Sequence, residues 1–355
     1  MKILVISLAG IGDTIFATPL IHELRASHPD ATIDVLVMWP GSRQVLEGNP
    51  HVNSVHQHDL IKTSPLDALK FLRPLRATRY DISLSTHPQS RIQYRLVARY
   101  VAARTRLSHT YECSGWRDRF LVNRTTPQDY SIHCVENNLA LLGLMGTQRK
   151  LSTHHYELFL TGDEEQWAAD FVARHGLAGQ RLLGLHVGSG GTKNLQLRRW
   201  PVGHYVELVK RLNQERKDVS VLLFGGPEEK EAHKVILRET NSPLVMQPDS
   251  RNIRQAAALL KKCRAFISVD TALMHLAAVA RVPKQIVIET PTFNKTVEPY
   301  GQPFELVPNQ AVAGRNLEYY RYDGGDIKGT DEELRRCMAS VTVDAVYAAV
   351  CRALD

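Results

Sequence analysis

A loop near the start of the chain places a carboxylate beside glycines. Gly10 and Gly12 follow the apolar run 2–7, and Asp13 and Thr14 open a segment with helical spacing. A strand that ends in glycines and continues into a helix usually brings backbone N–H groups to a ligand. Asp13 either caps this helix, as aspartate often does, or faces a ligand at the carboxyl edge of a parallel sheet.

This loop only partly matches G-x-G-x-x-G, the fingerprint of dinucleotide binding. The third glycine position is Ile15, and the expected second strand, 32–38, ends in Trp39 and Pro40 without the carboxylate that binds a ribose 2′-hydroxyl. The sequence therefore argues against a nicotinamide-dependent dehydrogenase.

A second glycine-rich loop, at 188–193, carries cations and hydroxyls. It follows an apolar run, and a further cation stands shortly after it. Backbone N–H groups, hydroxyls and cations can all reach the oxygens of a diphosphate, and arginine can do so with two donors. The plainer interpretation is an exposed basic turn. The residues expected to contact a diphosphate here are Ser189, Gly190, Gly191, Lys193 and Arg198.

Two further strand ends in the second half have a similar character. One glycine-rich turn follows the apolar run 219–224, and the run 265–269 leads into Asp270, where a helix begins at once. The free N–H groups of that helix favour an anion, although Asp270 could serve only as a cap and His275 could be only a buried histidine. The three loops together predict a nucleotide diphosphate site. Their remaining candidates are Gly225, Asp270, Thr271, Ala272 and His275.

Positive charge is concentrated in one region of the chain. The formal net charge is +7, and the segment from Lys70 to Arg124 holds twelve Lys or Arg against three acidic residues. A helix expected over 90–103 carries arginines at four-residue spacing, which suits anionic phosphates, a membrane surface or plain solvent. The region lacks a nucleic-acid-binding motif, so we expect no nucleic-acid partner. The three arginines are Arg91, Arg95 and Arg99.

Short apolar runs alternate with amphipathic segments throughout, which is typical of a parallel sheet with helical crossovers. The first half predicts strands at 2–7, 32–38, 53–57 and 80–84, helices at 14–27, 41–48, 65–76 and 90–103, and a less regular stretch ending in a helix near 134–145. The second half predicts strands at 182–187, 219–224, 244–246, 265–269 and 285–289, and helices at 163–175, 203–215, 227–239, 252–262, 271–280 and 342–353.

These elements predict an α/β protein of two doubly wound domains. The 355 residues exceed what one hydrophobic core usually holds. Periodicity is lost over 146–156, so we place the domains at 1–155 and 156–340, and expect the helix in 341–355 to pack back onto the first domain. The five cysteines are scattered, which indicates free thiols, no structural zinc site and a reducing compartment. No run of eighteen apolar residues occurs, and we expect a cytoplasmic protein.

Several motifs together resemble glycosyltransferase family nine, the ADP-heptose:lipopolysaccharide heptosyltransferases and their relatives. The resemblance covers nearly the whole chain. Its motifs are Gly10-Ile11-Gly12-Asp13, Arg198-Arg199-Trp200-Pro201, Gly225-Gly226-Pro227-Glu228 and Asp270-Thr271-Ala272-Leu273-Met274-His275-Leu276-Ala277.

The resemblance implies a GT-B fold, in which two Rossmann-like domains face each other across an interdomain cleft. It implies the acceptor on the N-terminal side and the nucleotide-sugar on the C-terminal side. It also implies inversion at the anomeric carbon without a metal, with Asp13 as the general base, and the sequence contains no D-x-D motif. A single carboxylate suffices for one-step inversion, because it only has to take the proton of the acceptor hydroxyl.

Two positions depart from the pattern of the resembled family. Arg198 stands where the family has lysine, which keeps the charge but changes its geometry, so Lys193 competes for the phosphate contact. Glu289 and the residues after it replace an aromatic-containing F-G-P-T motif. Glu289 either binds a sugar or ribose hydroxyl or points into solvent.

The sequence thus favours transfer of a heptose from ADP-heptose to a lipopolysaccharide inner-core or related glycolipid acceptor. We expect peripheral contact with the cytoplasmic face of the inner membrane, and no cofactor other than the ADP-sugar co-substrate. The alternatives are a GT-B sugar-nucleotide epimerase and a non-catalytic protein that binds sugar nucleotides or polyanions.

Overall fold

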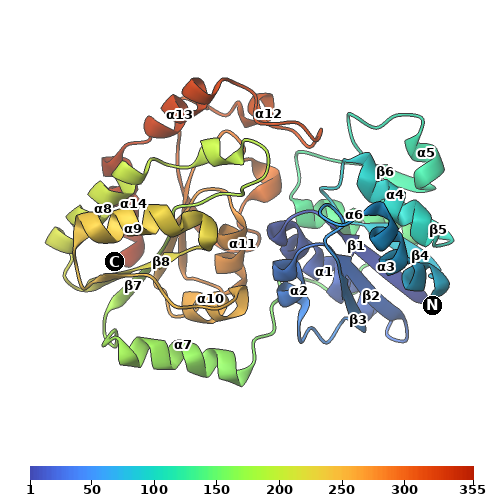
Figure 1. The fold of residues 1–355 in the computed structure, drawn as a ribbon, viewed down its shortest axis with the longest axis horizontal. Helices are drawn as coiled ribbons and strands as arrows, with labels where there is room; N and C mark the ends of the chain where they lie inside the picture. The colour runs from blue at the N-terminus through green and yellow to red at the C-terminus, as the bar shows by residue number, and fades with distance from the viewer. The chain divides into compact units, whose positions relative to one another are not determined.

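The computed structural model describes residues 1–355, apart from the side chain of Arg119. The chain divides into two compact units (Figure 1). Unit 1 comprises Met1–Phe159 and Tyr322–Gly324, and unit 2 comprises Leu160–Arg321 and Gly325–Asp355. This division differs from the expected boundary at 155, and the return of three residues to unit 1 has no signal in the sequence.

Unit 1 is built on a six-stranded parallel sheet in the order β3-β2-β1-β4-β5-β6. In register, Lys2 pairs with Thr32 and Ile3 with Ile82. The strands are β1 (Lys2–Ser7), β2 (Thr32–Val37), β3 (Ser54–Gln57), β4 (Ile82–Ser85), β5 (Thr105–Thr110) and β6 (Arg124–Pro127). The helices are α1 (Ile11–Ser27), α2 (Pro40–Leu46), α3 (Pro65–Ala77), α4 (Ile92–Val101), α5 (Asp118–Leu121) and α6 (Cys134–Met145).

Unit 2 repeats this plan with a parallel sheet in the order β12-β11-β10-β7-β8-β9. The strands are β7 (Arg181–His186), β8 (Val219–Phe224), β9 (Val245–Met246), β10 (Ala265–Ser268), β11 (Lys284–Ile288) and β12 (Phe304–Val307). The α-helices are α7 (Gly162–Arg174), α8 (Val202–Glu215), α9 (Lys230–Thr240), α10 (Ile253–Leu260), α11 (Ala272–Val279), α12 (Asn316–Tyr319), α13 (Asp331–Ala339) and α14 (Val343–Leu354), and the 3₁₀ turns are η1 (Leu195–Arg198), η2 (Pro227–Glu229) and η3 (Lys295–Val297).

The apolar runs form central strands because both faces of each sheet are covered by helices. All six residues of β8 are buried, and so are five of the six in β1. On one face of the unit 1 sheet, Leu4 and Ile6 of β1 pack with Leu72 of α3 and Ala98 of α4. The loops at the carboxyl ends of the parallel strands are where such sheets form their sites.

The C-terminal helix packs on unit 2, so the expectation that it returns to the first domain is wrong. Val346 and Val350 of α14 belong to one buried cluster with Leu185 of β7 and Val221 of β8. The buried Trp200 donates from Nε1 to the backbone oxygen of Val341, 2.9 Å away, just before α14 begins. The apolar face of α14 therefore completes the core of unit 2.

Two further expectations concern cysteines and membrane spans. All five cysteines are free thiols, as predicted. No single helix in the described part of the chain is both long and apolar enough to cross a membrane, and only the bent pair α13 and α14 meets these criteria when its two helices are taken together.

Candidate active site

In unit 1, the predicted Asp13 loop lies at the switch point of the sheet. β2 and β3 extend the sheet in one direction from β1, while β4, β5 and β6 extend it in the other. Ligands of doubly wound sheets bind beyond the carboxyl ends of the strands at such a point. Residues 8–10 follow β1 and lead into the first turn of α1, which carries Asp13, and residues 86–91 follow β4. Both loops therefore belong to the expected crevice of this sheet.

Asp13 closes the first turn of α1. Its Oδ2 accepts a hydrogen bond of 2.5 Å from the backbone N–H of Gly10, which has no side chain of its own to cap the helix. Asp13 is half-buried. A carboxylate offers two oxygens and about four lone-pair positions, so capping and a contact with a ligand are compatible.

The neighbouring candidates differ in where they point. Gly10 and Gly12 lie in the turn itself, where the chain enters α1. Thr14 is fully buried, and its hydroxyl donates to Ser42 Oγ at 2.9 Å. The Thr14 hydroxyl is therefore bonded to protein groups, and it stabilises the start of α1.

The charge of Asp13 affects the pKa values of two tyrosines. Burial raises the pKa of Tyr94 on α4, and the Asp13 carboxylate adds to this effect against the opposing charge of Arg91. Burial also raises the pKa of Tyr111 after β5, again with a contribution from Asp13. The Tyr111 hydroxyl accepts from the Gln89 N–H at 2.8 Å. Tyr94 on α4 and Tyr111 after β5 thus lie within electrostatic range of Asp13, and the sequence did not single them out.

In unit 2, four loops with candidate residues follow adjacent strands. The order β11-β10-β7-β8 places the ends of these strands side by side, and the switch point falls between β10 and β7. The glycine-rich loop at 187–193 follows β7, and Asp270 and Thr271 come directly after β10. Gly225 follows β8, and Glu289 follows β11. The expected diphosphate loops therefore share one edge of one sheet.

A buried polar network joins three of these loops. Arg198 Nη1 donates to Asp270 Oδ2 and to Thr292 Oγ1, both at 2.9 Å. The Thr292 hydroxyl in turn donates to the same Asp270 oxygen at 2.9 Å. The side chains of Arg198 and Asp270 are 11% and 10% exposed, so this is a buried ion pair. The sequence predicted Arg198 and Asp270 as site residues. It did not predict that they pair with each other, or that the Thr292 hydroxyl bonds to both.

The loop at 188–191 is held against η2 by charged side chains. Arg199 donates to Ser189 Oγ at 3.1 Å and to Ser189 O at 3.0 Å, and it lies 3.7 Å from Glu229. A Cβ at Gly188 would come within 2.0 Å of Glu229 Oε1, and one at Gly191 within 2.5 Å of Glu228 Oε1. A side chain at either glycine would therefore force the neighbouring glutamate side chain to move.

Thr271 caps α11 and joins the loop to β7. Its hydroxyl accepts from Met274 N and lies 3.2 Å from His186 Nδ1. Burial lowers the pKa of His186 to about 3, and the positive charges of His233, Arg199 and Arg198 contribute. His275 is buried in α11, and Ala272 begins that helix. The N-terminus of α11, whose first backbone N–H groups favour an anion, thus lies at this edge of the sheet.

Lys193 and Glu289 have separate partners in unit 2. The ammonium of Lys193 donates to Gly325 O and lies 5.2 Å from the ring centre of Tyr320. Glu289 is buried, and its Oε2 accepts from Asn309 N at 2.8 Å. Of the two expectations for Glu289, exposure to solvent is wrong, because this carboxylate satisfies backbone and amide donors inside the unit.

Comparison with known proteins decides the family. The sequence pattern of glycosyltransferase family 9 (heptosyltransferase) matches residues 68–320, which is more than half of the chain. The chain belongs to glycosyltransferase family 9. It is therefore a glycosyltransferase, and its two parallel sheets form a GT-B fold, as the sequence predicted.

Curated relatives of this glycosyltransferase carry related names. Lipopolysaccharide heptosyltransferase 2 of Salmonella typhimurium is 29% identical over 78% of this chain and 80% of its own length. Lipopolysaccharide heptosyltransferase 3 of Escherichia coli is 23% identical over 87% of this chain and 90% of its own length. Both alignments run along most of each protein.

Solved structures share the fold over the whole chain. A family 9 glycosyltransferase from Veillonella parvula has a TM-score of 0.77 at 18% identity and covers 99% of this chain and 97% of its own. E. coli ADP-heptose lipopolysaccharide heptosyltransferase II has a TM-score of 0.72 at 22% identity, with 100% and 98% covered. These likenesses establish the fold of the glycosyltransferase.

The predicted three-arginine face of this glycosyltransferase needs correction. Arg91 and Arg99 are exposed, but Arg95 is buried on α4. Arg95 pairs with Asp118 and donates to His109 O at 2.7 Å. Its guanidinium is therefore a structural cation, which fastens α5 and the loop before it to α4.

Proposed function

We propose that this glycosyltransferase moves a heptose from ADP-heptose to a lipopolysaccharide inner-core or related glycolipid acceptor. The proposal is carried by sequence similarity. The six curated proteins that match the chain are named as lipopolysaccharide or lipooligosaccharide heptosyltransferases. An E. coli heptosyltransferase of the same fold was solved with ADP-2-deoxy-2-fluoro heptose. The donor and acceptor classes are inferred from these relatives.

Asp13 is the proposed general base. It would take the proton from the acceptor hydroxyl while that oxygen bonds to the anomeric carbon, and the ADP oxygen would leave from the opposite face. The half-buried position of Asp13 at a sheet switch point supports this role. A single displacement of this kind inverts the anomeric configuration.

Unit 2 is the proposed donor side. Its sheet edge carries the N-terminus of α11, the Ser189–Gly191 backbone and the cations Arg198 and Lys193, and we propose that these groups face the leaving diphosphate. Fixed donors of this kind would stabilise the charge that develops on the leaving oxygen. We propose that transfer needs no metal.

The donor preference is testable by calorimetry. Titration with ADP, UDP, GDP and NAD in the presence of EDTA should show selective binding of ADP. Preference for UDP or GDP would keep the glycosyltransferase but move the donor, and binding of NAD alone would contradict the proposal.

Peripheral contact with the cytoplasmic face of the inner membrane is proposed for the α4–α5 side of unit 1. Trp116 and Phe120 are 69% and 68% exposed, and their rings contact each other edge to face. A pocket of about 540 Å³ beside Trp116 is lined by Arg91 and Arg117 and also by the carboxylates of Asp118 and Asp323. Exposed aromatics flanked by cations suit an anionic lipid surface.

Replacing these aromatics should weaken membrane binding. Trp116→Ser with Phe120→Ser should lower the affinity for vesicles containing anionic phospholipid by about tenfold or more, because two large apolar contacts are lost. Cosedimentation measures this affinity. Leu66→Ser is the matched control, since Leu66 is 70% exposed on α3 of the same unit. Equal losses for both variants would contradict the assignment of this surface.

A further inference from the structure

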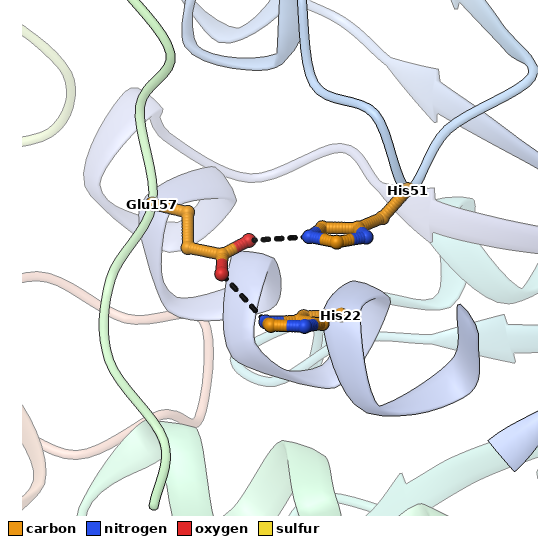
Figure 2. A group of neighbouring side chains, drawn as sticks. All are labelled: His22, His51 and Glu157. Atoms are coloured by element: carbon orange, nitrogen blue, oxygen red, sulfur yellow. Dashed lines mark ion pairs between the residues drawn. The ribbon is translucent and has the colours of Figure 1, made fainter. Parts of the chain in front are cut away.

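Three side chains with metal-binding chemistry meet in unit 1, and the proposed transfer does not use them. His22 lies on α1, His51 in the turn before β3, and Glu157 on the extended segment that leads toward α7 (Figure 2). Glu157 Oε1 is 2.6 Å from His22 Nδ1, and Glu157 Oε2 is 3.5 Å from His51 Nε2. One donor atom from each residue lies within 4.8 Å of the other two.

The surrounding backbone holds this cluster in place. Glu157 N donates to Thr18 Oγ1 at 3.0 Å, and Thr18 stands one helical turn before His22 on the same face of α1. His51 N donates to Asn49 Oδ1 at 2.8 Å. The Thr18 contact thus joins the Glu157 segment to α1, and the Asn49 contact fixes the turn that carries His51, while neither contact uses a metal-donor atom.

We propose that His22, His51 and Glu157 bind a divalent transition cation of the Zn²⁺ class. Two imidazole nitrogens and one carboxylate oxygen form a common zinc donor set, with water as the fourth ligand. Bonds of about 2.0–2.2 Å place the ligand atoms of a tetrahedral site roughly 3.3 Å apart. The cluster therefore has to contract slightly between its most distant atoms, and the short His22–Glu157 contact has to open.

The imidazole rings must also move a little. They are stacked, with centroids 3.9 Å apart and planes 10° apart, and both face the same carboxylate (Figure 2). A metal lies close to the plane of each ring that binds it, so one ring turns out of the stack when the cation enters. His22 is the more exposed of the two histidines, with 34% of its side chain accessible, and has the room to turn.

The electrostatics of the cluster favour a cation at Glu157. Its Oε2 is buried and accepts no hydrogen bond from the described residues. The positive charge of Arg25 opposes the binding of a cation here. Its guanidinium donates to Asn53 and to the backbone oxygens of Pro29, Ala31 and His51.

The bound cation would cross-link two segments of the chain. It would join the segment around Glu157, which leads from unit 1 into unit 2, to the helix whose first turn carries Asp13. His22 stands about 13 Å along α1 from Asp13, at 1.5 Å of rise per residue. The site therefore supports the framework of the enzyme, and the inference goes beyond heptose transfer and does not depend on it.

Calorimetry with Zn²⁺ on the EDTA-stripped full-length protein tests this site. Wild type should bind one Zn²⁺ with an affinity that falls by at least about tenfold in His51→Ala and in Glu157→Gln. His155→Ala is the matched control, because His155 is exposed two positions from Glu157 and lies outside the cluster. Equal affinity in all four proteins, or no binding to wild type, would overturn the proposal.

Thermal unfolding and Co²⁺ absorption provide readouts that misfolding cannot imitate. Zn²⁺ should raise the Tm of wild type and of His155→Ala, and should leave that of Glu157→Gln unchanged. Co²⁺ should give the strong visible absorption of a four-coordinate site in wild type and in His155→Ala, but not in His51→Ala or Glu157→Gln. If Glu157→Gln does not fold, His51→Ala carries the same comparison, and a Co²⁺ spectrum identical to wild type in that variant contradicts the site.

Discussion

Asp13→Asn should lower the rate of heptose transfer by about 10²- to 10⁴-fold and leave ADP binding unchanged. The magnitude is that of a lost general base. The amide oxygen of asparagine can still accept from the Gly10 N–H, so the start of α1 should persist. Initial rates and ADP calorimetry on the same preparation separate the loss of chemistry from the loss of donor binding.

Asp67→Asn is the matched control for this variant. Asp67 occupies the same position in α3 that Asp13 occupies in α1, and its Oδ2 accepts from the capping Ser64 hydroxyl at 2.8 Å. Asp67 is exposed, and its helix follows β3, which lies at the edge of the sheet and not at the switch point. Its replacement should leave the transfer rate unchanged. A transfer rate above a tenth of wild type in Asp13→Asn would show that Asp13 is only a helix cap.

Arg198→Ala should destabilise the protein by about 3–5 kcal/mol in the free energy of unfolding. It leaves the buried Asp270 carboxylate with the Thr292 hydroxyl but without its cation, and an uncompensated buried charge is costly. Urea denaturation measures the change. The exposed pair Arg238–Glu239 provides the control, because Arg238→Ala should cost about 1 kcal/mol or less.

The double variant Arg198→Met, Asp270→Leu shows whether the loss of stability comes from an unpaired buried charge or from lost side-chain packing. If the cost of Arg198→Ala comes from the abandoned carboxylate, removing both charges should be less destabilising than the sum of the single changes. Additive losses, or a loss in Arg198→Ala no larger than in Arg238→Ala, would contradict a stabilising pair. ADP affinity of the folded variants then reports separately on the proposed diphosphate contact.

The strands that match the prediction residue for residue carry long apolar runs. β1 and β8 are buried along nearly their whole length, so most of their residues are apolar and their limits match the prediction. β5 was missed because its buried interior includes Ser108 and His109, which have polar partners inside unit 1. β12 was missed because only one of its four residues is buried, so no apolar pattern marks it.

Several of the predicted site residues lie in loops just after strands. Strand order then explains why the loops of Asp270, Ser189 and Gly225 share an edge. Periodicity cannot tell that Arg95 is buried, because its partner Asp118 arrives from a later segment of the chain. For the same reason α14 shows an apolar face in the sequence, but nothing there identifies unit 2 as the surface that covers it.

The most direct test of the account is ADP release from ADP-heptose with a lipopolysaccharide inner-core acceptor in EDTA. We expect one ADP for each heptose transferred, no release without the acceptor, and a product whose anomeric configuration, determined by NMR, is inverted. Release of ADP without acceptor, retention of configuration, or turnover only with a different sugar nucleotide would contradict the proposed heptose transfer.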